Sequence, residues 1–268
     1  MATHFDLTTD APDLIAVDFL ANKTGLSKAK IKDAMNKGAC WWVLKGKQQR
    51  LRRATKVLSK NTRVQFYYDE TVLSRKTEEP ILLKDFARYS AWHKPHGMLA
   101  QGSQWGDHCS LLRSVELTTK RPVYLIHRLD ADASGIMLLA HDAQAAAKLS
   151  LLFQEHRLYK EYWARVEGKV ELAQPLTIET PIEDKAARTH ISLIHYDPDL
   201  HQSQLKVIIE TGRKHQIRRH LAGIGHPIVS DRLYGTAGKL PLQLLAKRVE
   251  FICPLTQQPI SIRALEND

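Results

Sequence analysis

The first part of the chain carries apolar residues at helical spacing. Apolar positions recur three and four residues apart near residues 15–20 and again over 28–37, so each segment predicts a short amphipathic helix. Ser27 is a good N-cap for the second helix, and Gly38 is a natural end to it. The chain is therefore expected to begin with two short helices.

Two strands are predicted after these helices. The run 41–47 is typical of a strand with a turn at Lys45-Gly46, and the run 62–68 predicts a second strand. Together with the helices they predict a small α/β domain over residues 1–69. Residues 70–85 show no clear period and contain a charged turn, which predicts a linker.

The pattern changes from about Arg88 to short apolar runs separated by turn residues, which predicts many short strands. A longer helix is expected from Asp142 to about Leu158, and a shorter one from Lys214 to Ala222. Many strands with few helices indicate an α+β domain over residues 86–268. Its sheet is expected to be mixed and mainly antiparallel, with flanking helices.

Positive charge is concentrated in the N-terminal domain. The protein has a formal net charge of +10, from Lys+Arg 39 and Asp+Glu 29. Twelve of the cations lie within residues 28–63 with the single acid Asp33, so this segment alone carries +11. Such a cluster predicts a polyanionic partner, either nucleic acid or an anionic membrane surface.

The arginines of this segment favour the nucleic acid. A lysine-rich helix face can simply be solvated, but an arginine cluster that continues the same excess favours phosphate contacts. The segment SKAKIKDAMNKGA, followed by a strand and a Lys-Gly turn, resembles the small RNA-binding domain named after ribosomal protein S-four. The RNA-binding residues expected here are Lys28, Lys30, Lys32, Arg50, Arg52 and Arg53.

Composition argues against membrane, disulfide-bonded and metal-binding proteins. No run approaches the roughly 18 apolar residues of a membrane-spanning helix, and the polar N-terminus does not have the pattern of a signal peptide. The three cysteines lie far apart without a CxxC pair, and the histidines do not have metal-ligand spacing. The expectation is a cytoplasmic protein with no metal ion and no membrane contact.

Two polar segments of the larger domain carry candidate chemistry. HRLDADASGIMLLA presents His127, Arg128 and Asp130 in a loop between two apolar strands. The second segment begins at residue 211 and reads TGRKHQIRRHLAGIGHPIVSDRLYG. It places Arg218 on a helix, where the guanidinium could bind a carboxylate or a phosphate through two of its nitrogens. Taken alone, Arg128 and Asp130 are better explained as a surface ion pair, which contributes little to stability. Each of the two segments is ambiguous by itself.

Together the two segments resemble the RluA-type pseudouridine synthases. HRLDxxxSG is followed about 30 residues later by KxY, then by TGRxHQIRxH and GHPIxxDxxYG, with KPxG upstream at residues 94–97. The resemblance spans roughly residues 85–255. It departs from the family at Ala133, where Thr is usual, and at Leu244-Leu245-Ala246, where a His is missing. It implies an RNA pseudouridine synthase, an isomerase that needs no cofactor.

The family's roles then fall on particular residues of this chain. The resemblance makes Asp130 the essential aspartate and Arg218 the residue that pairs with its carboxylate. It implies that Tyr162 stacks on the target uracil and that Arg128 enters the RNA in place of the flipped uridine. Further contacts with RNA are expected from residues in the same motifs: His127, Lys160, Arg213 and His215.

These residue types suit the reaction. A base stacked in RNA must be flipped out before it can turn, at a cost of a few kcal/mol that aromatic stacking and a planar guanidinium can offset. A carboxylate placed against the sugar can trap the electron-poor anomeric carbon. It can alternatively act first as a general base, and the sequence leaves both routes open.

The same residues bear on the RNA target and on alternative functions of the protein. The basic domain slightly favours ribosomal RNA over transfer RNA, and a monomer is expected. The main alternative is a non-catalytic RNA-binding or ribosome-assembly factor on the same fold. A glycosidase-like hydrolase is a more distant alternative, since Asp130 has no second acid in a paired arrangement.

Overall fold

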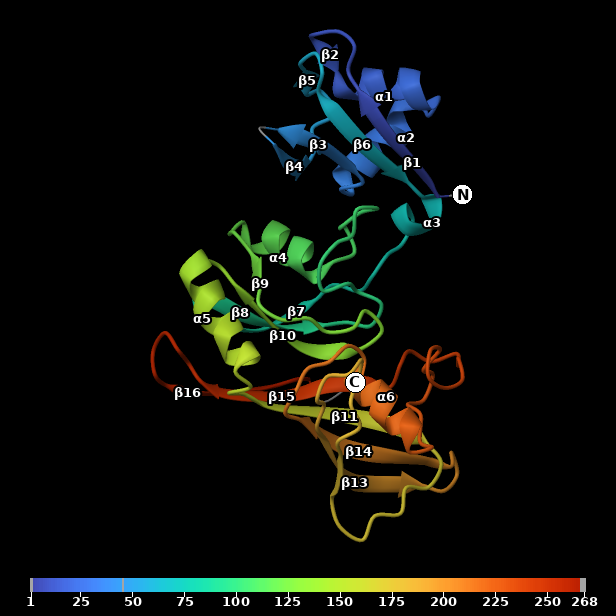
Figure 1. Ribbon diagram of the computed structural model, residues 1–268, viewed down its shortest axis with the longest axis vertical. Helices are drawn as coiled ribbons and strands as arrows, with labels where there is room; N and C mark the ends of the chain where they lie inside the picture. Colours follow the sequence, from blue (N-terminus) through green and yellow to red (C-terminus); the bar gives the residue numbers. More distant parts are fainter. Residues whose placement is uncertain (1, 45, 266–268) are drawn as a thin grey trace. The chain divides into compact units, whose positions relative to one another are not determined.

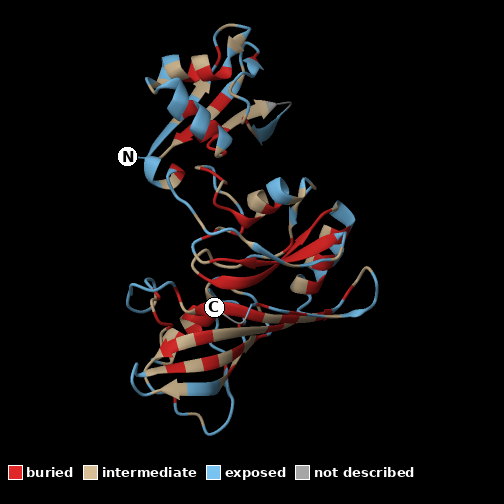
Figure 2. Cartoon of the chain, turned by 180° about the vertical axis from the view of Figure 1, so that it is seen from behind, coloured by how far each residue is buried: buried red, intermediate tan, exposed pale blue. Residues whose placement is uncertain are grey.

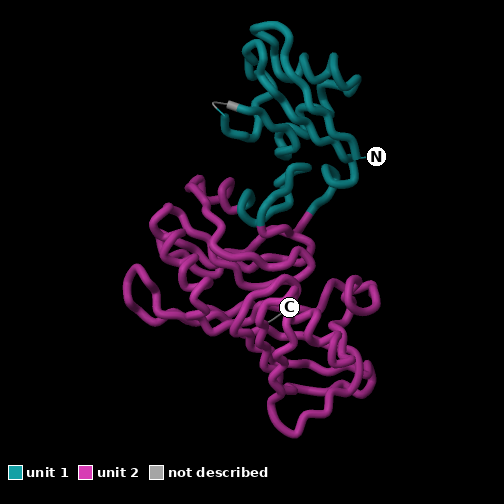
Figure 3. Tube along the Cα trace, viewed as in Figure 1, with its two compact units in different colours: residues 1–76, 101–114 teal, residues 77–100, 115–268 magenta. Residues whose placement is uncertain are grey.

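The chain forms two compact units. The computed structural model describes residues 2–44 and 46–265. Unit 1 comprises residues 1–76 and 101–114, and unit 2 comprises residues 77–100 and 115–268 (Figure 3). The predicted turn at Lys45-Gly46 includes Lys45, which is outside the described residues.

Unit 1 is a four-stranded antiparallel sheet with helices packed against it (Figure 1). The strand order is β1-β6-β3-β4, and a second small pair is formed by β2 and β5. The elements are β1 (Thr3–Thr8), β2 (Leu14–Ile15), α1 (Ala16–Thr24), α2 (Lys28–Asn36), β3 (Cys40–Leu44), β4 (Lys47–Arg50), β5 (Val57–Leu58), β6 (Arg63–Tyr68) and α3 (Glu70–Leu73).

Both predicted helices of unit 1 are confirmed. The Ser27 hydroxyl accepts a hydrogen bond from the Lys30 amide at 3.4 Å, and Gly38 ends the helical stretch with φ of +81°. The apolar face of α2, with Ile31 and Met35, is buried against Leu20 of α1 and Phe66 of β6. Burial of this stripe is the main force that holds two such short helices in place.

Residues 101–114 belong to unit 1 although the sequence analysis assigned them to the larger domain. The Trp41 indole donates to the carbonyl of Gln104 at 3.0 Å, and the amide of Asp107 donates to the carbonyl of Lys37 at 2.8 Å. Tyr67 and Trp105 also meet edge to face at 5.3 Å. The segment has no apolar period, so its distant partners leave no trace in the local pattern.

Unit 2 is built on one ten-stranded sheet. Its order is β12-β13-β14-β11-β15-β10-β8-β7, with β16 on β15 and β9 on β10. All of its described strand pairs are antiparallel except β10 with β15, so the predicted α+β fold with a mainly antiparallel mixed sheet is confirmed. The strands are β7 (Ile81–Asp85), β8 (Tyr89–Lys94), β9 (Tyr124–Leu125), β10 (Ser134–Ala140), β11 (Tyr159–Glu167), β12 (Leu176–Ile178), β13 (Thr189–Asp197), β14 (Gln202–Ile209), β15 (Leu244–Ile252) and β16 (Pro259–Arg263).

Two helices lie wholly in unit 2, α5 (Ala143–Gln154) and α6 (Gln216–Gly223), whereas α4 (Leu111–Thr119) begins in unit 1 and ends in unit 2. The α5 helix is capped by Asp142, whose carboxylate accepts the Ala145 amide at 2.8 Å. The predicted linker, 70–85, differs from the structure because it contains α3 and the edge strand β7. The residues of β7 are mostly exposed and lack alternation, which explains why the pattern did not reveal a strand.

The strand that leaves the HRLD segment is buried along its whole length, as is its neighbour β8. Every residue of β10 is buried (Figure 2). Gly135 has φ of +113°, and a Cβ there would clash with the backbone of Ala246 on β15. The close approach of β10 and β15 therefore requires glycine and fixes the chain directly after the loop that carries Asp130.

Candidate active site

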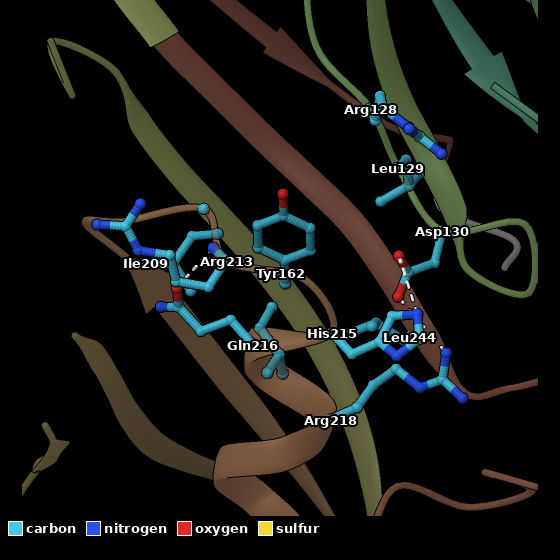
Figure 4. A pocket seen from close by; sticks show the side chains of 12 residues that line it. Arg128, Leu129, Asp130, Tyr162, Ile209, Arg213, His215, Gln216, Arg218 and Leu244 are labelled. Atoms are coloured by element: carbon cyan, nitrogen blue, oxygen red, sulfur yellow. Dashed lines mark hydrogen bonds and ion pairs between the residues drawn. The ribbon is translucent and has the colours of Figure 1, made fainter. Parts of the chain in front are cut away.

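Asp130 lies in the loop between β9 and β10, in the wall of a cavity (Figure 4). Its side chain retains 31% exposure, so a ligand in the cavity can reach the carboxylate. Loop residues hold the turn, because the amide of Ala133 donates to the Asp130 carbonyl at 3.2 Å and the amide of Gly97 to the Ala131 carbonyl at 2.8 Å. Ala133 itself is fully buried.

Lys94, from the KPxG segment, stabilises the same loop through hydrogen bonds to its backbone. Its buried ammonium donates to four backbone carbonyls at 2.6–3.2 Å, those of Pro95, Met98, Ala131 and Ala133. Burial lowers the pKa of Lys94 to about 7. In the sequence this lysine is visible only as part of a motif, and its hydrogen bonds to the loop backbone could not be predicted from it.

Arg218 is present beside Asp130, but its principal partner is a different acid. It extends from α6 and is buried, with Nη1 3.5 Å from Asp130 Oδ2. Its Nε and Nη2 donate to the two oxygens of Asp231 at 2.8 and 2.6 Å, a bidentate pair. Asp231 is fully buried and also accepts the amides of Leu233 and Tyr234.

This pair keeps both groups charged in the interior. Burial acts against the charge on Arg218, but the hydrogen bonds and attraction of Asp231 outweigh it and raise the pKa of Arg218. Burial likewise opposes the charge on Asp231, yet the bonds from Arg218 keep the pKa of Asp231 below its usual value. The predicted Arg218–Asp130 contact is therefore the weaker arm of an Asp231–Arg218–Asp130 chain.

Tyr162, on β11, and His215, at the start of α6, line the cavity with Asp130 (Figure 4). Burial, aided by the charge of Asp130, raises the pKa of Tyr162 to about 12, so the phenol keeps its proton at neutral pH. Nε2 of His215 is 3.8 Å from Asp130 Oδ1, and its Nδ1 is 3.0 Å from the Tyr234 hydroxyl. Burial lowers the pKa of His215, which makes the neutral ring the main form at pH 7.

Arg128 and Arg213 line the cavity from opposite sides of Tyr162 (Figure 4). Arg128 is exposed and has no acidic partner in the part of the chain that the structure describes. Arg213 is half-buried, and its Nε donates to the Ala186 carbonyl at 2.9 Å. Both guanidiniums thus keep donors for an anionic ligand.

His127 and Lys160 are less accessible than their motifs suggest. The ring of His127 stacks on Phe153 at 4.2 Å, and its Nε2 accepts the Leu138 amide at 2.9 Å. Burial lowers the pKa of His127 to about 3, so the ring is neutral and serves the packing of β10. Lys160 is buried, with its ammonium 3.4 and 3.5 Å from the carbonyls of Glu210 and Thr211.

The arginines expected to bind RNA in unit 1 are largely engaged within it. Arg50 and Arg52 both pair with Asp107, with Arg50 Nε at 3.0 Å, and their side chains are 16% and 26% exposed. Arg50 also stacks over Trp41 at 4.1 Å and donates to the Ser103 carbonyl. Asp107 follows these arginines by more than 50 residues, so the charge count of residues 28–63 could not include it.

The remaining cations of the predicted set lie on the surface of unit 1. Lys28 pairs with Asp18 at 2.7 Å, and Lys30 with Glu70 at 2.6 Å, in exposed contacts. Lys32 and Arg53 are exposed and, among the described residues, have no acidic partner. These two therefore keep the full charge that a phosphate would recognise.

The described residues also bear on metal binding and on membrane spans. Among residues 2–44 and 46–265, no group of three or more His, Cys, Asp or Glu side chains is arranged to hold a metal ion. No helix in this part of the chain is long and apolar enough to cross a membrane.

Comparison with known proteins identifies the family. The model of the RNA pseudouridylate synthase family matches residues 88–223. A tRNA pseudouridine synthase C from Pasteurella multocida (strain Pm70) is 32% identical over 209 residues, which cover 65% of this chain and 86% of that protein. YhcT of Bacillus subtilis (strain 168), an uncharacterized RNA pseudouridine synthase, is 34% identical over 155 residues, covering 52% of this chain and 51% of that protein. The chain belongs to the RNA pseudouridylate synthase family.

The enzyme class follows from this membership. The chain is an RNA pseudouridine synthase, an isomerase, as its motifs predicted. The human protein RNA Pseudouridylate Synthase Domain Containing 1 shares the fold, with a TM-score of 0.61 and 20% identity over 72% of this chain and 86% of that one. The alternatives of a non-catalytic RNA-binding factor and of a hydrolase are not supported.

Proposed function

We propose that this enzyme isomerises uridines in transfer RNA, with Asp130 as its catalytic carboxylate. The observation that carries this is the setting of Asp130: a partly exposed carboxylate that faces a cavity with Tyr162 and lies beside the buried, fully paired Arg218. No other carboxylate lines that cavity among the described residues.

Each neighbour of Asp130 has a role in this proposal. The reaction breaks the bond from C1′ to N1 of uracil, turns the base and joins C1′ to C5. The C5 hydrogen leaves as a proton and N1 takes up a proton, so the composition is unchanged. Asp130 acts at the sugar, and Tyr162 provides a neutral aromatic wall for the turning base. Arg218, held by Asp231, orients Asp130, and the exposed Arg128 fills the space left by the flipped uridine.

Transfer RNA is favoured as the target by the names of relatives. Proteins from Pasteurella multocida and Vibrio cholerae, 32% and 31% identical, are each named tRNA pseudouridine synthase C. The preference for ribosomal RNA drawn from the basic N-terminal domain has no support in these names. Unit 1, which resembles the S-four domain in sequence, is proposed to grip RNA through exposed cations such as Lys32 and Arg53.

Tritium release tests this proposal. RNA labelled at C5 of uracil loses its tritium as the new bond forms, so wild type is expected to release it from unmodified transfer RNA. Asp130→Asn should reduce the rate at least about a thousandfold, a loss of about 4 kcal/mol of transition-state stabilisation. The matched control is Asp132→Asn, two residues after Asp130. It removes only an exposed ion pair with Arg232 and should keep its activity.

Two results would contradict the proposal. Release from ribosomal RNA alone would refute the substrate class but leave the role of Asp130 standing. Full activity of Asp130→Asn would refute the catalytic assignment, whichever RNA responds.

A further inference from the structure

A second cavity of unit 2 adjoins the active-site cavity. The two share Arg128, Tyr162 and Arg213 in their linings, but the second, of about 580 Å³, is much larger than the first, of about 100 Å³. Its size falls within the range of roughly 300–1,000 Å³ that is usual for small-molecule sites. A ligand that fills the first cavity can therefore continue into the second past the same side chains.

The lining of the second cavity is cationic. Arg128, Lys160 and Arg213 contribute to it. The ring of His156 also lines the cavity, but burial lowers the pKa of His156 and so favours its neutral form. No carboxylate is among its described lining residues. A buried positive charge such as that of Lys160 is unfavourable without a compensating anion, so this lining favours an anionic ligand.

Lys160 is the strongest indication of an anionic ligand, and a comparison of its hydrogen-bond partners with those of Lys94 shows why. Both ammonium groups are buried without an acidic partner among the described residues. Lys94 is satisfied by four carbonyls at 2.6–3.2 Å, whereas Lys160 has two carbonyls at 3.4 and 3.5 Å, which are long for hydrogen bonds. Burial alone lowers the pKa of Lys160 to about 8, so the contrast between the two lysines lies in their hydrogen-bond distances.

The same cavity offers an aromatic surface. His127 and Phe153, which stack on each other at 4.2 Å, both line it and are only partly buried. Aromatic side chains next to cations are the combination that binds a base and its phosphate in single-stranded RNA.

We propose that this second cavity binds the nucleotide next to the target uridine, with Lys160 and Arg213 on its phosphate. This inference rests on the proposed function, because it takes the first cavity to be the place of the target base. The enzyme then holds two consecutive nucleotides outside the RNA stack, one for chemistry and one as an anchor.

The salt dependence of RNA binding tests the role of Lys160. Dissociation constants for unmodified transfer RNA and ribosomal RNA are measured over a range of salt, without turnover. Lys160→Met should lower the slope of log Kd against log salt by about 0.7–0.9, the value for one phosphate contact. Lys160→Arg should restore most of the slope.

The control is Lys148→Met, which removes the same charge from an exposed position of α5 outside the cavity lining and should leave the slope unchanged. Thermal unfolding identifies any variant that fails to fold. In that event Arg213→Gln, a change at a half-buried residue of the same cavity, should lower the slope in its place.

Unchanged slopes in the folded variants, or no binding of either RNA by wild type, would overturn the inference. A reduced slope without tritium release by wild type would support the phosphate site while refuting the proposed reaction. The two proposals can therefore fail separately.

Discussion

At the scale of single residues, the site depends on an acid that does not face the substrate. Asp231 is fully buried, binds two nitrogens of Arg218 and has no exposure to the cavity beside Asp130. Removing one member of a buried ion pair leaves the other charged and uncompensated, which typically costs about 3–5 kcal/mol. Asp231 therefore positions Arg218, and through it Asp130.

We expect Asp231→Asn to reduce both stability and turnover. The amide keeps the size of the side chain but loses its charge, so Arg218 is free to turn toward Asp130. The free energy of unfolding in urea should fall by about 3 kcal/mol, and kcat should fall far more than RNA affinity. Asp132→Asn breaks an exposed pair instead and should lose at most about 1 kcal/mol. Equal behaviour of the two variants would mean that the buried pair does not position the site.

The sequence predicted the residues of this site better than their partners. Asp130, Tyr162, Arg218 and His215 lie around one cavity, and their roles in the reaction stay predictions. Asp231 was not predicted to pair with Arg218, because sequence spacing cannot tell which of several acids reaches a given arginine. Burial decides that choice, and it depends on how α6 packs.

At the scale of elements, the loop between β9 and β10 is fixed by backbone contacts rather than by its own side chains. Lys94 donates to the carbonyls of Ala131 and Ala133 within the loop and to that of Met98 outside it, and Gly135 brings β10 against β15. Local sequence predicted a loop between two apolar strands. The lysine beneath it comes from β8, 36 residues before Asp130, and only the pairing of β8 with β10 brings the two together.

Lys94→Met should loosen this loop. The methionine keeps the apolar stem, but four buried carbonyls lose their donor, and each unsatisfied group costs about 1–3 kcal/mol. We expect at least about 2 kcal/mol less stability in urea and a lower kcat. Lys84→Met, at an exposed position of the neighbouring strand β7, is the control and should differ little from wild type.

The pH dependence of this variant gives a second readout. Because burial lowers the pKa of Lys94 to about 7 from its ordinary 10.5, the unfolded chain binds more protons between these values than the folded one. Stability from this group therefore rises with pH above 7, by up to about 1.4 kcal/mol per pH unit. The difference between wild type and Lys94→Met should grow from pH 7 to pH 9, and a constant difference would contradict the assignment.

At the scale of the whole molecule, the chain leaves unit 2 to complete unit 1. Residues 101–114 bring Asp107 to Arg50 and Arg52, and Trp105 to Tyr67. Charge counted along the sequence predicted a cluster of free arginines, since the excess of +11 in residues 28–63 is real. The three-dimensional arrangement withdraws two of these arginines from solvent, which no local pattern could indicate.

Asp107→Asn tests whether this pairing limits RNA binding. Without the carboxylate, Arg50 and Arg52 lose their shared anion and become available to phosphate. We expect unit 1 to become less stable to heat, while the slope of log Kd against log salt for transfer RNA increases by about 1–2, at about 0.9 per added phosphate contact. The control is Asp6→Asn, which frees Arg63 from an exposed pair where the guanidinium is already accessible, so the slope should hardly change. Loss of stability with no change in slope would mean that Arg50 and Arg52 serve only to hold residues 101–114, and that unit 1 contacts RNA through its exposed cations alone.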